Sequence, residues 1–433
     1  MQQPVLSPVT SGVDPQPVST RQRWAIVTLL FTCMVFCYAQ RGALSIAAPF
    51  MMQELNLSPA VMGVLLSAFF WSYSFMQMPA GWMVDRFGVR RAFAWGYAFW
   101  SVASAFTGFA RGLTTLVAAR MLLGIGQSVA FPAAARAVAN WFEDRHRGTV
   151  TAVYMTGVRV GQALIATVGV VLLTQWGFLA FFVITGVVPL VWLLPWNAVM
   201  GRLDQTPDAS DPQTRSSTPP SGTAPRAGRL GFLQSLALFR FRTVHGIFWG
   251  YFAYDYVWFL YVLWLPGYLK LERGFSTREM AIYSSVPYLV MIGVILASGV
   301  ASDWLIRSGF SEMKVRKGFI AAGLTVACLI VPAGIVEDKM TAVWLLTISM
   351  CGLGLCTPNT WGLTQAACSR GIVGTVSGIM NFGGNLGGML APVITGYIVH
   401  ATGSFALALS VAGGMAILGI VFYLFLIGKR VEV

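Results

Sequence analysis

Two segments of the chain share one pattern. Residues 148–161 read GTVTAVYMTGVRVG, and residues 374–387 read GTVSGIMNFGGNLG. Both fit G-T-V-[S/T]-x5-G-x3-G, so their glycines recur at the same offsets. A second match joins Gly81-x3-Asp85 to Gly299-x3-Asp303. Glycines four residues apart on a helix permit close helix packing. The two matches in corresponding places indicate a duplicated helical unit, with one copy in each half of the chain.

The composition places both copies in a membrane. Hydrophobic residues make up 56% of the 433 residues and charged residues 10%, and the mean hydropathy is +0.68. A soluble domain carries about 25% charged residues. Runs of about 20 apolar residues, which is the length that spans a bilayer, recur along the chain. The composition therefore excludes a soluble globule, a disordered chain and a secreted disulfide scaffold, and it predicts a polytopic membrane protein.

The apolar runs predict twelve transmembrane helices, six on each side of a linker. The predicted helices span 24–48, 59–84, 92–110, 113–139, 148–174, 178–200, 243–269, 279–306, 317–336, 341–365, 372–399 and 404–428. The intervening residues 201–240 are rich in Pro, Ser, Thr and Gly, which is typical of a disordered linker. We therefore predict an all-α membrane protein in five parts. The parts are a disordered cytoplasmic tail (1–20), a six-helix half (21–200), a cytoplasmic linker (201–240), a second six-helix half (241–428) and a short cytoplasmic tail (429–433).

Lysine and arginine are distributed unevenly over the predicted loops. Of the 29 basic residues, 20 fall in tails and loops on one side and five in loops on the other. Because positively charged loops remain cytoplasmic, both termini are predicted to be cytoplasmic. The net charge of +13 therefore reflects topology, and no nucleic-acid partner is expected.

The loop after the second predicted helix carries a known signature. It reads Gly81-Trp-Met-Val-Asp85-Arg86-Phe-Gly88-Val-Arg90-Arg91. This segment resembles the G-x3-D-R-x-G-x-R-[R/K] motif of the major facilitator superfamily at every position. The resemblance implies two six-helix halves that rock about a substrate site near the midplane of the membrane. It also implies a cytoplasmic gate formed by Asp85, Arg86 and Arg90, with Asp303 as the counterpart in the second half.

Four further segments resemble one branch of this superfamily, the anion:cation symporters, which include galactonate, glucarate and hexuronate transporters. The segments are 38–49, 120–132, 264–269 and 381–384. The resemblance implies transport of a small organic anion across the bacterial inner membrane, with Arg41 as the ligand of its carboxylate. For Arg120, in the same predicted helix as Gln127, we expect a structural or gating role.

Two positions depart from the pattern of this branch. Its members carry acidic residues at the positions of Gln40 and Gln127, and the resemblance assigns proton coupling to those acids. An amide has a similar shape but cannot titrate. Of sixteen acidic residues, Asp255 is the one that falls midway along a predicted helix. An ionisable group at that depth costs at least about 2.5–3.5 kcal/mol, so we expect a function for Asp255, namely proton coupling. The alternative is a static pair with Arg159 that only holds the fifth and seventh predicted helices together.

Candidate substrate-binding residues are polar side chains of the predicted helices. Tyr38 and Arg41 share a helix face, being three residues apart. Arg159 has three alternatives: it pairs with Asp255, binds a second carboxylate, or extends toward the membrane surface. The remaining candidates either bind hydroxyl groups of a sugar acid or pack as core and interface residues. They are Tyr73, Gln162, Asn359, Thr360, Trp361, Asn381 and Asn385.

The sequence thus predicts a monomeric secondary transporter of small organic anions, in the sugar-acid class, with a proton as the coupled ion. The alternative is an uncoupled uniporter or exchanger, because Gln40 and Gln127 cannot titrate. A non-transporting sensor on the same fold is disfavoured, because the tails and linker leave little room for a signalling domain. The sequence carries no nucleotide-binding loop and no catalytic constellation, so we expect neither an enzyme nor a cofactor or metal.

Overall fold

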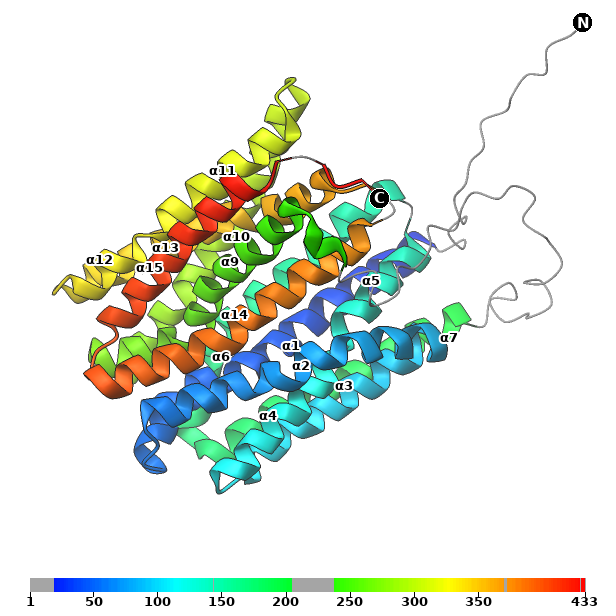
Figure 1. Ribbon diagram of the computed structural model, residues 1–433. Coiled ribbons are helices and arrows are strands. Elements are labelled where there is room, and N and C mark those ends of the chain that lie inside the picture. Colours follow the sequence, from blue (N-terminus) through cyan, green and yellow to red (C-terminus); the bar gives the residue numbers. More distant parts are fainter. Residues whose placement is uncertain (1–18, 143, 205–236, 370–371, 429, 433) are drawn as a thin grey trace, which may run out of the picture.

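The computed structural model describes residues 19–142, 144–204, 237–369, 372–428 and 430–432, and these are almost entirely helical (Figure 1). Most of the predicted tail (1–20) and of the predicted linker (201–240) lies outside the described residues. The helices of the first half are α1 (Thr20–Glu54), α2 (Pro59–Phe87), α3 (Val89–Phe106), α4 (Leu113–Gln127), α5 (Ala130–Trp141), α6 (Asp144–Val187) and α7 (Leu193–Asp204). Those of the second half are α9 (Arg242–Gly267), α10 (Thr277–Arg307), α11 (Glu312–Ala327), α12 (Ile330–Ile335), α13 (Lys339–Ala367), α14 (Val373–Thr402) and α15 (Ala406–Val421).

Nine of the described segments are long and apolar enough to cross a membrane. One of them, Val150–Leu203, has 54 residues and contains two predicted spans, which are separated by Gly177 at φ 74°. The helices α3 and α9 also correspond to predicted spans but are not among the nine. Both are rich in Trp, Tyr, Gly and Ser or His, which are less hydrophobic than aliphatic residues. The predicted fold class, an all-α membrane protein with twelve spans, is therefore confirmed.

The repeated glycines of the first half bring two helix backbones together. A Cβ atom at Gly157 of α6 would lie 2.6 Å from the carbonyl oxygen of Phe31 in α1. A Cβ atom at Gly161 would overlap the carbonyl group of Val35, one turn further along α1. The helices α6 and α1 therefore touch through their main chains.

The matching glycines of the second half also bring two helix backbones together. A Cβ atom at Gly383 of α14 would lie 2.8 Å from the carbonyl oxygen of Phe248 in α9, and one at Gly387 would lie 2.9 Å from that of Phe252. Phe248 and Phe252 are again one turn apart. The sequence repeat is thus a duplicated helix contact, in which α14 packs on α9 as α6 packs on α1.

The two halves meet along three pairs of helices: α1 with α9, α2 with α14 and α6 with α10. The Ser45 hydroxyl donates to the carbonyl oxygen of Leu263 at 2.7 Å, and the Ser285 hydroxyl donates to that of Ala163 at 3.2 Å. In Figure 1, the start of α1, the end of α7 and the start of α9 lie at the same end of the bundle. The Ser45–Leu263 bond lies between Arg41 and the opposite end.

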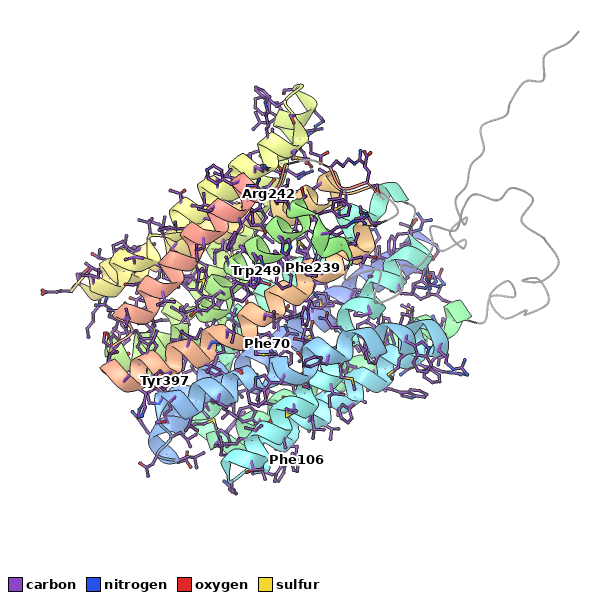
Figure 2. All side chains as sticks on the ribbon, viewed as in Figure 1. Phe70, Phe106, Phe239, Arg242, Trp249 and Tyr397 are labelled. Carbon is purple, nitrogen blue, oxygen red and sulfur yellow. The ribbon has the colours of Figure 1, made fainter. Side chains whose placement is uncertain are left out.

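The outer surface of the bundle is apolar. Large side chains project from it (Figure 2), among them Phe106, with 48% of its surface exposed, and Tyr397, with 66% exposed. Exposed Trp, Phe, Leu and Val residues occur on helices of both halves. A water-soluble protein rarely exposes large continuous apolar patches, so this surface is suited to contact with lipid.

Replacing Gly161 with alanine is expected to lower the melting temperature of the detergent-purified protein. The added Cβ would overlap the Val35 carbonyl and separate α6 from α1, and such overpacking costs about 1–3 kcal/mol. The control is Gly414→Ala on α15, where a Cβ would meet no atom within 4 Å. This variant should match or exceed the parent, because alanine is the better helix former. Equal melting temperatures for the two variants would contradict the packing role of Gly161.

Candidate functional site

Arg41 lies in the middle of α1 with 2% of its surface exposed. Its guanidinium carbon lies 4.4 Å from the ring centroids of Tyr38 and Phe69 and 4.8 Å from that of Tyr73. Its Nε donates to Oε1 of Gln127 at 3.2 Å, and its Nη1 donates to the Tyr38 hydroxyl at 3.3 Å. Within the described part of the chain, its Nη2 has no hydrogen-bond partner. The site therefore presents a guanidinium among aromatic rings and neutral acceptors.

Gln40 and Gln127, which stand where related transporters carry acidic residues, have different hydrogen-bond partners. Nε2 of Gln127 donates to the Cys37 carbonyl at 3.0 Å, which directs the amide oxygen toward Arg41. Nε2 of Gln40 donates instead to the Thr185 carbonyl at 3.0 Å and to the Ser101 hydroxyl at 3.4 Å. Gln40 thus joins α1 to α3 and α6, and only Gln127 belongs to the Arg41 cluster.

Arg159 on α6 is buried, with 8% of its surface exposed. Its guanidinium carbon lies 3.6 Å from the ring centroid of Trp258, and that ring meets Tyr288 edge-on at 5.9 Å. No ion pair within 4.0 Å joins Arg159 to Asp255, both of which are described residues. Because the Arg159 side chain is buried, it does not extend toward the membrane surface either. The structure therefore shows neither an ion pair with Asp255 nor an extension toward the membrane surface, and binding of a second carboxylate by Arg159 stays a prediction.

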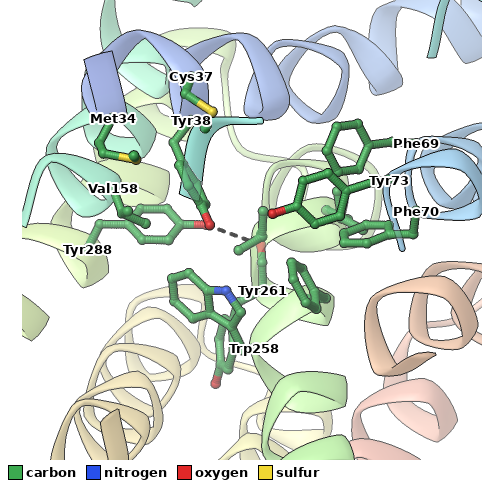
Figure 3. Packing of buried hydrophobic residues seen from close by; sticks show 14 of the residues in the cluster. Met34, Cys37, Tyr38, Phe69, Phe70, Tyr73, Val158, Trp258, Tyr261 and Tyr288 are labelled. Carbon is green, nitrogen blue, oxygen red and sulfur yellow. Dashed lines mark hydrogen bonds between the residues drawn. The ribbon is translucent and has the colours of Figure 1, made fainter. Parts of the chain in front are cut away.

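The two arginine clusters adjoin. The Tyr38 phenol interacts electrostatically with both Arg41 and Arg159. Figure 3 shows Tyr38, Tyr73, Trp258 and Tyr288, from α1, α2, α9 and α10, directed toward a common region. Helices from both halves therefore contribute to one aromatic centre.

Asp255 lies on α9 with 7% of its surface exposed. Its Oδ2 approaches Gly384 of α14 so closely that a Cβ atom there would collide with it. The phenols of Tyr251 and Tyr254 interact electrostatically with its carboxylate, as does Arg159. Glycine at position 384 is thus what allows a carboxylate to fit between α9 and α14.

Asn381 connects the two halves through a residue that the sequence analysis missed. Its Nδ2 donates to Oε1 of Gln77 on α2 at 3.0 Å. Tyr73, one turn before Gln77 on the same helix face, interacts with both Gln77 and Arg41. The spacing of Tyr73 and Gln77 was a signal that could have identified Gln77.

Two further candidates carry unsatisfied polar atoms. Nδ2 of Asn385 and both polar side-chain atoms of Gln162 are buried and have no hydrogen-bond partner among the described residues. Gln162 lines a small pocket between α1, α6, α9 and α10, together with Ser45, Ser284 and Tyr288. Such groups are available to a hydroxylated ligand.

The candidates on α13 divide between two faces. Nδ2 of Asn359 donates to the Ser298 hydroxyl of α10 at 2.9 Å, and the Thr360 hydroxyl donates to the backbone of its own helix. Both are fully buried, and the structure does not bring them to the Arg41 cluster. Trp361 instead packs edge-on against Tyr251 at 6.2 Å, near Asp255.

The predicted gate residues lie near helix ends, except Arg120. The side chain of Asp85 lies outside the described residues. Arg86 is exposed, and Nε of Arg90 donates to Oδ1 of Asn197 at 3.4 Å, which joins α3 to α7. Asp303 forms an ion pair with Arg316 of α11 at 3.6 Å. Arg120, 1% exposed, donates from Nη2 to the Arg41 carbonyl at 3.4 Å and so supports the central cluster.

Comparison with known proteins identifies the family of the chain. Residues 30–392 match the model of the family described as Major Facilitator Superfamily. The chain is 31% identical to a D-galactonate transporter of Escherichia coli O6:H1, with 95% of this chain and 97% of that one covered. It is 30% identical to the probable galactarate/D-glucarate transporter GarP of Escherichia coli K12, with 98% and 99% covered.

A solved structure shows the same fold at low identity. It is an inward-facing, occupied bacterial homologue of the human lysosomal transporter Spinster, with a TM-score of 0.75 and 16% identity over 94% of this chain and 97% of that one. The chain therefore belongs to the major facilitator superfamily, in the group that contains the named galactonate and galactarate/glucarate transporters.

Proposed function

We propose that the protein is a secondary transporter of small organic anions of the sugar-acid class, located in the bacterial inner membrane. The observation that carries this proposal is Arg41, a buried guanidinium with neutral partners and a free Nη2. A charge at membrane depth is costly unless it is compensated. A carboxylate compensates the charge and matches the planar fork of an arginine. The names of the relatives support the same class of substrate.

The surrounding polar groups would bind the hydroxyls of such an anion. Tyr38 and Tyr73 flank Arg41, and Gln162 and Asn385 carry buried atoms without partners. A buried unsatisfied polar atom costs about 1–3 kcal/mol, which a substrate hydroxyl would recover. The same groups would therefore favour a hydroxylated acid over a plain fatty acid.

Alternating access would use the contacts between the halves. The Ser45–Leu263 and Ser285–Ala163 hydrogen bonds close one side of the central cluster. The Gln77–Asn381 bond joins the second half of α2 to the first third of α14. The end of α2 and the start of α14 lie at the end of the bundle at which α1 starts (Figure 1). With that end cytoplasmic, as the loop charges predict, outward opening would break the first set of bonds and inward opening the second.

Coupling to protons would proceed through Asp255. Among the described residues it is the one buried carboxylate, and it has no ion pair. An anion that occupies Arg159 would remove the positive field that favours ionised Asp255, so Asp255 would then accept a proton. The alternative of an uncoupled uniporter or exchanger is supported by Gln127, a fixed neutral amide beside Arg41.

Counterflow in proteoliposomes tests the function. Vesicles preloaded with unlabelled D-galactonate or galactarate should transiently accumulate the labelled acid from outside, and galactitol, which has no charge, should not compete. Binding without counterflow would identify a sensor. Absence of both binding and counterflow for sugar acids, uronates and dicarboxylates would refute an organic-anion transporter.

A further inference from the structure

The centre of the protein carries an excess of positive charge. Among the described residues, the buried ionisable side chains of Arg or Asp are Arg41, Arg120, Arg159 and Asp255. Three positive groups face one negative group while Asp255 is ionised, which leaves an excess of two; the excess is three when Asp255 is protonated. Gln40 and Gln127 lie at the same depth and contribute no charge. An uncompensated charge is least favourable when the site closes and water is excluded. The occluded state therefore favours a substrate with two negative charges over one with a single negative charge.

Arg120 is engaged with the backbone of α1, although its buried Nε has no hydrogen-bond partner among the described residues. It is the most deeply buried of the three arginines, and its Nη2 donates to the Arg41 backbone. Its guanidinium carbon lies 5.6 Å from the Phe69 ring, which also contacts Arg41 at 4.4 Å. Arg120 thus supports the helix segment that holds Arg41.

Arg159 is placed to bind an acidic group of the substrate. Its guanidinium lies 3.6 Å from the Trp258 ring centroid, and no hydrogen bond from it reaches another described residue. A guanidinium over an aromatic face keeps N–H donors available at its edges. Arg159 interacts electrostatically with Tyr38 and Tyr288, two of the side chains around the common region in Figure 3. Arg41 contacts the same Tyr38.

We propose that the substrate is a dianion, a short organic acid with two acidic groups, one bound by Arg41 and the other by Arg159. This inference rests on the proposed function and specifies its substrate class. The first acidic group takes the free Nη2 of Arg41 and lies against Tyr38 and Tyr73. The second takes the free edge of Arg159 beside Trp258 of the other half. A bound dianion therefore compensates the excess charge and connects the halves.

Two matched pairs of probes test the proposal by calorimetry on purified protein. Galactarate and D-galactonate share a six-carbon polyhydroxy chain and differ in whether C6 is a carboxylate or an alcohol. Adipate and 6-hydroxyhexanoate repeat this comparison without the other hydroxyls. The parent should bind each diacid about tenfold or more tighter than its monoacid, a difference of about 1.4 kcal/mol. Arg159→Gln should reduce diacid affinity to that of the monoacid and change monoacid affinity about twofold or less.

The control is Arg278→Gln on α10, which removes an exposed arginine and should keep the preference for diacids. Arg159→Lys serves as a second variant, because it keeps the charge but loses the planar contact with Trp258; it should keep part of the preference. If Arg159→Gln does not fold, the ratio of diacid to monoacid affinity is compared between the parent and Arg159→Lys, and this comparison tests the proposal.

Equal affinity of the parent for diacid and monoacid would overturn the inference. So would an Arg159→Gln variant that weakens both members of each pair by the same factor. In either case the acids would still bind and would still depend on Arg41. Failure of the proposed function is distinct, because then none of the four probes would bind or move.

Discussion

Arg41→Ala is expected to weaken binding of D-galactonate and galactarate by about 100-fold or more and to abolish counterflow. Removing one partner of a buried, hydrogen-bonded charge pair costs about 2–5 kcal/mol. Here the loss is also geometric, because Tyr38, Phe69 and Tyr73 surround the guanidinium and would be left around a void. Calorimetry on purified protein and counterflow on the same preparation measure the two effects.

Arg41→Lys separates charge from shape. It keeps the positive charge but loses the bidentate fork and the Nε–H that donates to Gln127, so binding should be intermediate. Arg202→Ala, which removes an exposed arginine of α7, is the matched control and should behave as the parent. An Arg41→Ala protein that binds either acid with the dissociation constant of the parent would show that the anion binds elsewhere.

Asp255→Asn is expected to abolish accumulation driven by a pH gradient while exchange of substrate continues. Asparagine has the shape of aspartate and fits beside Gly384, but it cannot carry a proton. Exchange needs no net proton movement, so counterflow should persist at a rate near that of the parent. The two assays are run on one batch of proteoliposomes, with and without an imposed pH gradient.

Three other results would each exclude proton coupling through Asp255. A parent that never accumulates substrate on a pH gradient would be a uniporter or an exchanger that uses another ion or substrate. An Asp255→Asn variant that accumulates like the parent would place coupling on another group. Loss of both activities with a lower melting temperature would assign a structural role. Glu54→Gln, at the exposed end of α1, is the control for loss of a carboxylate and should retain both activities.

Part of the central cluster follows from helix geometry alone. Tyr38 and Arg41 are three residues apart, and the structure places the phenol and the guanidinium in contact. The same geometry indicates that Gln40, the neighbour of Arg41, points about 100° away, since a helix has 3.6 residues per turn. The structure agrees, because Gln40 binds Ser101 and Thr185. The resemblance places an acid that couples to protons at position 40, but the Gln40 side chain here makes no hydrogen bond to Arg41.

Other partners could not be read from spacing. Asn381 and Asn385 are one turn apart, yet Asn381 binds Gln77 of the other half while Nδ2 of Asn385 has no partner among the described residues. Asn359 belongs to the same predicted set but binds Ser298 on α10. These contacts depend on how α13 and α14 are rotated about their axes, which no pattern within either helix reveals.

The sequence by itself determined the membrane environment, the twelve spans, the duplicated helix contact and the buried arginine at the centre of the candidate site. Each of these depends on composition or on spacing within one segment, and the cost of a charge in lipid is independent of its neighbours. Only the tertiary structure decided that Arg159 faces Trp258 rather than Asp255, and that Gln127 rather than Gln40 holds Arg41. The physical reason is that lipid is as apolar as the protein core, so hydrophobic periodicity does not mark which face of a transmembrane helix points inward. That orientation is set by packing, above all where Gly161 and Gly387 let helix backbones touch.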